Sequence, residues 1–208
     1  MRDLKTLLIQ PKEYFEKFSK EEFENQKPFK LRYWFIAMII ISILNGIVVN
    51  LIMPNLLKNI GIESLGETTF YAIQAGTYII SPLISSLICV NILYFVIKIF
   101  MGLVEHDEIR NKKYFKSLLY IRYIVFSIVV AVLSLITMLL IKDEKFQLIA
   151  QQTNNLFVKL WATYFLYGLL KYGLNTNKLH KILPTILYIL TIIFAVLSIT
   201  GNLFAFGM

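Results

Sequence analysis

Hydrophobic residues in this chain gather into five long runs that are separated by short polar stretches. The runs cover residues 33–53, 71–101, 118–141, 156–172 and 182–206. A helix needs ~20 predominantly apolar residues to cross the hydrocarbon core of a bilayer. The pattern therefore predicts an all-α, polytopic membrane protein in which five transmembrane helices form one domain over residues 33–208.

Residues 1–32 precede the first run and have a different, amphipathic pattern. Apolar side chains recur there at three- and four-residue steps, at Leu4, Leu7, Leu8, Pro11, Tyr14, Phe15 and Phe18. This periodicity predicts a helix that lies flat on the membrane, with Pro11 in a first turn. The segment is either a docking surface for a partner or a lipid, or an interfacial anchor packed under the bundle. We favour the anchor, because such faces flanked by lysines are typical of interfacial helices. No cleavable signal peptide is expected, since the segment lacks a short apolar core.

The second run is longer than a straight helix needs in order to cross the membrane, and it contains Pro82. Proline removes one backbone donor from a helix, so a structural bend is expected, with Ser81, Ser85 and Ser86 able to bond the freed groups. The only cysteine, Cys89, lies in the same run and excludes a disulfide within the chain. We expect it to be a buried thiol that behaves as a small hydrophobe.

Composition and charge support the same class and add an orientation. Hydrophobic residues make up 57% of the chain and charged residues 16%. All but four of the 21 lysines and arginines lie in residues 1–32 or around the second and fourth connections, and these segments carry the whole net charge of +8. Cations are retained on the cytoplasmic side. We therefore expect a multi-pass protein of the cell membrane with its N-terminus in the cytoplasm and its C-terminus outside. The basic inner face predicts contact with anionic lipid headgroups, whereas no separate basic domain indicates nucleic acid.

Several uncharged polar residues lie within the apolar runs: Asn45, Asn50, Gln74, Asn91, Ser127, Ser134, Thr137 and Asn202. No ionisable side chain is expected near the midplane, which argues against a proton- or ion-coupled pump. Asn45, Asn91 and Ser134 are expected to form hydrogen bonds between helices.

Catalytic chemistry finds little support in the sequence. His106 lies in the acidic run of residues 105–108, but the other histidine, His180, has no spacing that would complete a metal site. Adjacent acids in a loop are usually solvated. No glycine-rich phosphate loop or nucleophile motif occurs. We expect a non-enzymatic protein with no catalytic, cofactor-binding or metal-binding residues.

Two parts of the chain resemble prokaryotic members of the Yip-domain family. Residues 8–18 (LIQPKEYFEKF) resemble the start of these proteins, and residues 100–103 (FMGL) with 114–119 (YFKSLL) resemble the connection after the second span. The chain departs from the family pattern in having Gly102 alone where paired glycines are frequent, followed by the acidic residues 105–108. The resemblance implies a non-enzymatic membrane protein with five helices, a cytoplasmic N-terminus and an outside C-terminus. Eukaryotic relatives are associated with Rab-type GTPases, whereas the isoleucine-, lysine- and asparagine-rich usage here suggests an AT-rich bacterial genome.

Two functions remain open at this point. The first is a scaffold, membrane-organising or partner-binding role, in which membrane lipids, a protein partner or a second copy of the chain are bound. The alternative is a small permease or transporter subunit with a polar path near Gln74, Pro82 and Asn91. This alternative requires a water-accessible cavity near the midplane.

Overall fold

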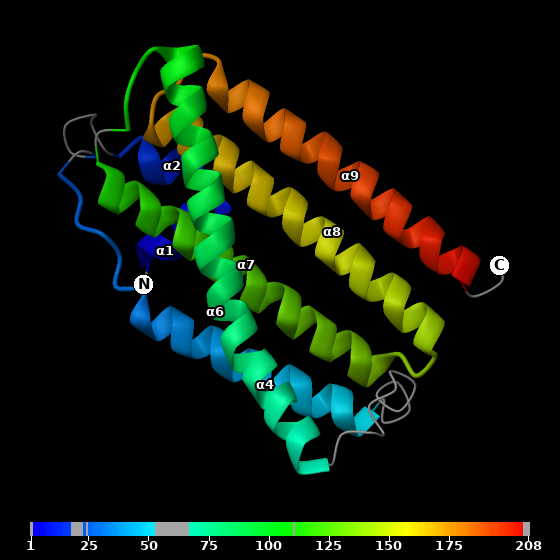
Figure 1. The fold of residues 1–208 in the computed structure, drawn as a ribbon. Coiled ribbons are helices and arrows are strands. Elements are labelled where there is room, and N and C mark those ends of the chain that lie inside the picture. The colour runs from blue at the N-terminus through cyan, green and yellow to red at the C-terminus, as the bar shows by residue number, and fades with distance from the viewer. Residues whose placement is uncertain (1, 18–22, 24, 53–66, 110, 206–208) are drawn as a thin grey trace.

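The computed structural model describes residues 2–17, 23, 25–52, 67–109 and 111–205, and this part of the chain is helical and contains no strand (Figure 1). Its α-helices are α1 (Arg2–Ile9), α2 (Pro11–Phe15), α4 (Arg32–Ile52), α6 (Glu67–Phe100), α7 (Lys112–Leu140), α8 (Glu144–Gly168) and α9 (Leu179–Ala205). Two π-helical turns, η2 (Met101–Glu105) and η3 (Leu169–Gly173), continue α6 and α8. The predicted all-α class is confirmed.

Each apolar run overlaps one long helix, although the ends predicted at Met53 and Phe206 lie outside the described residues. Three helices are long and apolar enough to cross a membrane by length and composition, over Ile79–Glu105, Lys112–Leu140 and Leu179–Gly201. A shorter apolar helix covers Arg32–Ile47. The helices thus fit a membrane protein.

The helix α8 begins well before the predicted start at residue 156, because its polar first turns find partners on α7. The side-chain amide of Gln147 donates to the carbonyl oxygens of Met138 at 3.2 Å and Ile141 at 3.1 Å. The amide of Asn154 donates to Thr137 Oγ1 at 3.0 Å. Because these hydrogen bonds satisfy polar amide groups, the polar residues before the apolar run can also be part of the helix.

The long helices pack side by side around α7, which contacts α4, α6 and α8, while α9 packs on α8 (Figure 1). Large apolar side chains cover the outer faces of α6 and α9; Phe95 is 61% exposed and Phe194 is 64% exposed. Such exposure is costly in water and is normal for faces that meet lipid. Cys89 is also exposed, so the prediction of a buried thiol is wrong. Although its thiol reaches the Tyr123 hydroxyl of α7, the contact between α6 and α7 leaves the Cys89 side chain exposed.

The helix α6 continues through Pro82 without interruption. The hydroxyl of Ser86 donates to the carbonyl oxygen of Leu83 at 2.7 Å, so one of the three serines named from the sequence does bond the backbone near the proline. The predicted bend itself stays a prediction.

The N-terminal segment folds back against the end of the bundle as two short helices instead of one. The break is at Gln10, whose φ of −129° and ψ of 63° are not helical. A residue before proline is disfavoured in the α region, and Pro11 starts α2 as predicted. Leu7 and Phe15 are at most 1% exposed and belong to the main core. The apolar face is therefore covered by protein, as in the favoured interpretation of a segment packed under the bundle, whereas its position at the membrane surface stays a prediction.

Candidate functional site

An aromatic cluster joins the N-terminal segment to the start of α7. The ring of Tyr114 lies 5.2 Å from that of Phe23, edge to face, and 5.9 Å from that of Phe29, stacked. The hydroxyl oxygens of Tyr14 and Tyr114 are 3.2 Å apart within hydrogen-bond distance. Aromatic pairs of this kind contribute about 0.5–1.5 kcal/mol beyond the area they bury. The cluster thus anchors the segment that precedes α4 on the bundle.

Asn111 connects the same two parts of the chain through its side chain. Its Oδ1 accepts from the backbone N–H of Tyr114 at 3.1 Å and thereby caps α7. Its amide donates to the carbonyl oxygens of Gln26 at 3.0 Å and Phe23 at 3.4 Å. Asn111 is not among the residues predicted from the sequence to be functional. Its role as a helix cap could have been predicted, because asparagine is frequent directly before a helix. Its bonds to the N-terminal segment could not, because they join residues far apart in the sequence.

Glu105 caps the start of α9 from a different loop. Its carboxylate accepts from the backbone N–H groups of Asn177 at 2.9 Å, Lys178 at 2.7 Å and Leu179 at 2.6 Å. Partial burial alone would raise the pKa of this carboxyl. The three backbone donors and the nearby His180 outweigh burial and lower the pKa below its usual value. Glu105 therefore joins the second and fourth connections of the chain.

The other members of the acidic run do not converge with Glu105 on one point. Asp107 Oδ1 accepts from the backbone N–H of Glu108 at 2.8 Å, and His106 is exposed with a left-handed φ of 54°. His180 is 5% exposed, and its Nδ1 lies 2.7 Å from the carbonyl oxygen of Thr176. Within the described ranges, no group of three or more histidine, cysteine or carboxylate side chains is arranged to hold a metal ion.

Two side chains attach α8 to its neighbours near the same end of the bundle. Trp161 Nε1 donates to the carbonyl oxygen of Leu8 at 3.0 Å, which holds α1 against α8. Arg122 Nε donates to the carbonyl oxygen of Ala162 at 2.8 Å, between α7 and α8. Arg122 lies four residues inside the predicted third span, although the cation pattern of the sequence groups it with the second connection. An ionisable group is therefore present within the helix bundle, close to its basic end.

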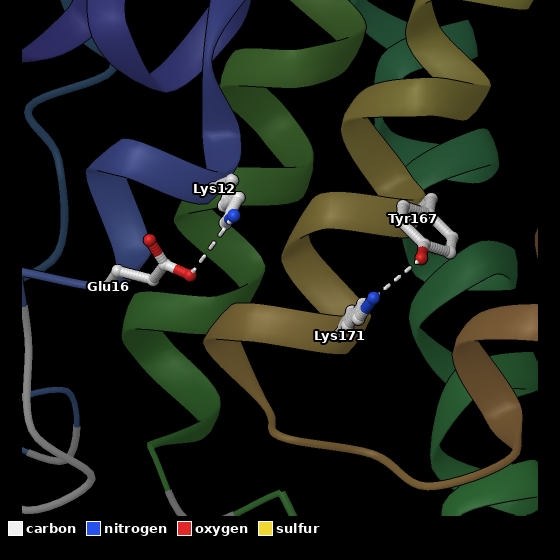
Figure 2. A network of polar contacts seen from close by, with 4 residues as sticks. All are labelled: Lys12, Glu16, Tyr167 and Lys171. Carbon is white, nitrogen blue, oxygen red and sulfur yellow. Dashed lines mark hydrogen bonds and ion pairs between the residues drawn. The ribbon is translucent and has the colours of Figure 1, made fainter.

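The connections that meet here also carry most of the exposed positive charge of the described chain. We call this surface the basic end; its exposed cations are Lys12, Lys17, Lys27, Lys30, Arg32, Lys112, Lys113, Lys178 and Lys181. Figure 2 shows two local contacts at this end: Lys12 Nζ and Glu16 Oε1 of the α2 region are 3.8 Å apart, and Lys171 Nζ of η3 donates to the Tyr167 hydroxyl at 3.0 Å. The basic end therefore has a defined surface built from three separate segments.

Of the hydrogen bonds between helices that were predicted for polar residues of the spans, one is confirmed and one is wrong. Asn45 of α4 donates to the carbonyl oxygen of Ala131 on α7 at 3.2 Å, as predicted. Asn91 is exposed and donates to the carbonyl oxygen of Leu87 on its own helix at 2.6 Å, so the prediction of a bond between helices is wrong. Asparagine can bond the carbonyl one turn back when no neighbouring helix faces it. Ser134 forms no hydrogen bond in the described part of the chain.

The residues named for a permease path do not line one cavity. Pro82 borders a cavity between α4, α6 and α7, whereas Asn91 is not among its lining residues and bonds its own helix. The side chain of Gln74 lies outside the described residues. Pro82 and Asn91 therefore do not line one cavity.

Comparison with known proteins agrees with this architecture. Neither the curated proteins nor the solved structures contain a match to the chain. The Yip1 domain, in contrast, matches residues 5–200. This match includes both the N-terminal segment and the long helices, and the chain accordingly belongs to the Yip1 domain family of membrane proteins.

Proposed function

We propose that the protein is a non-enzymatic scaffold of the cell membrane, whose basic end binds an acidic partner protein on the cytoplasmic side. In this proposal α4, α6, α7, α8 and α9 all cross the membrane, the N-terminus is inside and the C-terminus is outside. Residues 1–32 belong to the inner face and residues 33–208 form the transmembrane domain. Family membership supports the class of protein.

The observation that carries the binding role is the construction of the basic end. Its cations come from the N-terminal segment and from two connections, and hydrogen bonds hold these three segments together. Asn111 ties the second connection of the chain to the N-terminal segment, and Glu105 ties the same connection to the start of α9. A preorganised surface binds more tightly than separate mobile loops, because less conformational entropy is lost on binding. Anionic lipid headgroups would strengthen attachment by about 1 kcal/mol for each nearby cation.

Charge reversal on this surface tests the proposal without disturbing the core. A photo-crosslinking amino acid is placed at Lys30, and the full chain is expressed in its membrane. We expect a discrete protein adduct whose yield falls at least several-fold when Lys27 and Lys112, both exposed, are changed together to glutamate, because steering by opposite charge is lost.

Lys142→Glu is the matched control, since Lys142 is an exposed lysine in the connection between α7 and α8. This variant should leave the adduct unchanged. Absence of a protein adduct, or equal loss in the control, would contradict the proposed role. Deletion of residues 2–24 is a poorer experiment, because it removes core residues such as Leu7 and Phe15.

A further inference from the structure

A cavity of about 250 Å³ lies between α4, α6 and α7 and has an unusually polar lining for its position. Five hydroxyl-bearing side chains border it: Ser42, Ser81, Ser85, Tyr123 and Ser127. The rest of the lining is apolar and includes Met38 and Ile128, and no charged residue borders the cavity. The lining therefore combines hydroxyl groups with hydrocarbon groups.

The cavity is partly open and lies at mid-length of the three helices that line it. Ser42 is near the middle of α4, Ser85 near the middle of α6 and Ser127 near the middle of α7. These positions place it far from both ends of the helices. With a hydrocarbon core of ~30 Å, a site at mid-depth is ~15 Å from the level of lipid headgroups.

Some polar groups at the cavity satisfy one another and others do not. The Tyr123 hydroxyl shares hydrogen bonds with Ser85 and Ser127. The half-buried Ser42 forms no hydrogen bond within the described part of the chain, and neither does Ser81, which is exposed. Asn45, whose amide bonds the lining residue Ala131, has a buried Oδ1 without a partner among the described residues. An unsatisfied polar group is costly at membrane depth, because no bulk water can bond it.

We propose that this cavity is a binding site for a small, neutral polyol. Hydroxyl side chains both donate and accept hydrogen bonds, as the hydroxyls of a polyol do. A charged solute would find no opposite charge in the lining. The volume equals roughly eight water molecules at about 30 Å³ each, which suits a three- or four-carbon polyol. The apolar wall covers its C–H groups. The glycerol unit of a lipid lies at headgroup level, so the ligand is a free solute.

Saturation-transfer NMR with glycerol as the probe tests the site on the full chain in glycerol-free lipid nanodiscs. We expect signal transfer from the wild-type protein to glycerol. Ser85→Ala and Ser127→Ala should each weaken binding roughly two- to tenfold, the effect of one lost hydrogen bond. Ser134→Ala is the control on the same helix as Ser127 and should bind as the wild type does, because Ser134 does not line the cavity.

A second measurement uses only the wild-type chain, so it does not depend on how the variants fold. The Tyr123 hydroxyl also contacts the thiol of Cys89, the single cysteine. We expect glycerol to slow alkylation of Cys89 by N-ethylmaleimide, and 1-propanol, which has one hydroxyl, to slow it less. No transfer to glycerol, equal transfer in the serine variants, or equal protection by 1-propanol would overturn the proposal, and the cavity would then hold water alone.

Discussion

At the scale of single residues, the structure depends on side chains that bond to backbone far away in the chain. Glu105 accepts three N–H groups at the start of α9, and Arg122 donates to a carbonyl of α8. Backbone groups at helix ends have no partner within the helix, so a carboxylate there gains both hydrogen bonds and a favourable interaction with the helix dipole. Single substitutions at such positions should have effects beyond their immediate loop.

Glu105→Ala should lower the free energy of unfolding by about 1 kcal/mol at neutral pH, the typical effect of losing an N-terminal cap. Because the folded pKa of Glu105 is lowered, its contribution is present above the ordinary value of 4.5 and is lost as the pH falls through the folded pKa. Thermal unfolding in detergent at several pH values measures both effects. Glu108→Ala, in the same loop, is the control and should change little. If the difference in stability between the wild type and Glu105→Ala stayed the same at low pH, the charge of the carboxylate would not be involved.

A second residue-scale prediction concerns the close approach of α2 to the end of α8. A Cβ at Gly168 would lie 2.6 Å from both Cβ and Cγ of Pro11, whose ring cannot rotate away. Gly168→Ala should therefore destabilise the protein by about 1–3 kcal/mol, the usual range for an overpacked site. Gly76→Ala is the matched control, since nothing lies within 4 Å of the added carbon, and it should be neutral or slightly stabilising. Equal melting temperatures for the two variants would contradict the packing of α2 on α8.

At the scale of elements, the N-terminal segment behaves as part of the bundle and not as an appended helix. Its helices α1 and α2 contribute Leu7, Tyr14 and Phe15 to the core, and Trp161 holds α1 through the carbonyl of Leu8. Two short helices of this length would not be stable alone, because helix nucleation is costly. Their structure therefore depends on contacts with α7 and α8.

Asn111→Ala should uncouple this segment from α7. The variant loses the cap of α7 and both bonds to the carbonyls of Phe23 and Gln26. We expect faster amide hydrogen exchange in residues 25–31, together with a loss of about 1–2 kcal/mol in stability. Mass-spectrometric exchange measures the first effect. Lys113→Ala, an exposed neighbour in α7, should exchange as the wild type does, and unchanged exchange in Asn111→Ala would refute this linkage.

At the scale of the whole molecule, the helices separate charge between the two ends of the bundle. The N-terminal segment and the connections that contain Glu105 and Asn177 meet at the basic end, while the connection between α7 and α8 lies at the other end (Figure 1). Cations in short connections remain on the cytoplasmic side during insertion. The charge pattern and the arrangement of helices therefore predict the same orientation.

Cysteine accessibility tests this orientation in intact cells. In a Cys89→Ala background, a membrane-impermeant thiol reagent should label Lys142→Cys from outside and should label Lys178→Cys only after the membrane is opened. Both lysines are exposed in the structure, so burial does not account for a difference between them. Labelling of Lys178→Cys in intact cells would contradict the proposed topology.

The sequence by itself determined the helical class, the apolar core of each long helix and the segregation of cations, because these follow from local composition and periodicity; the polar start of α8 was missed. It also identified the amphipathic face of the N-terminal segment and the contact of Asn45 between helices. Only the tertiary structure decided what covers that face, that Cys89 is exposed, and that Asn91 bonds its own helix. It also decided the roles of Glu105, Asn111 and Arg122. Periodicity shows which side chains share a face, but the partner of a face or a polar group is set by contacts between residues far apart in the chain, for which local pattern has no signal.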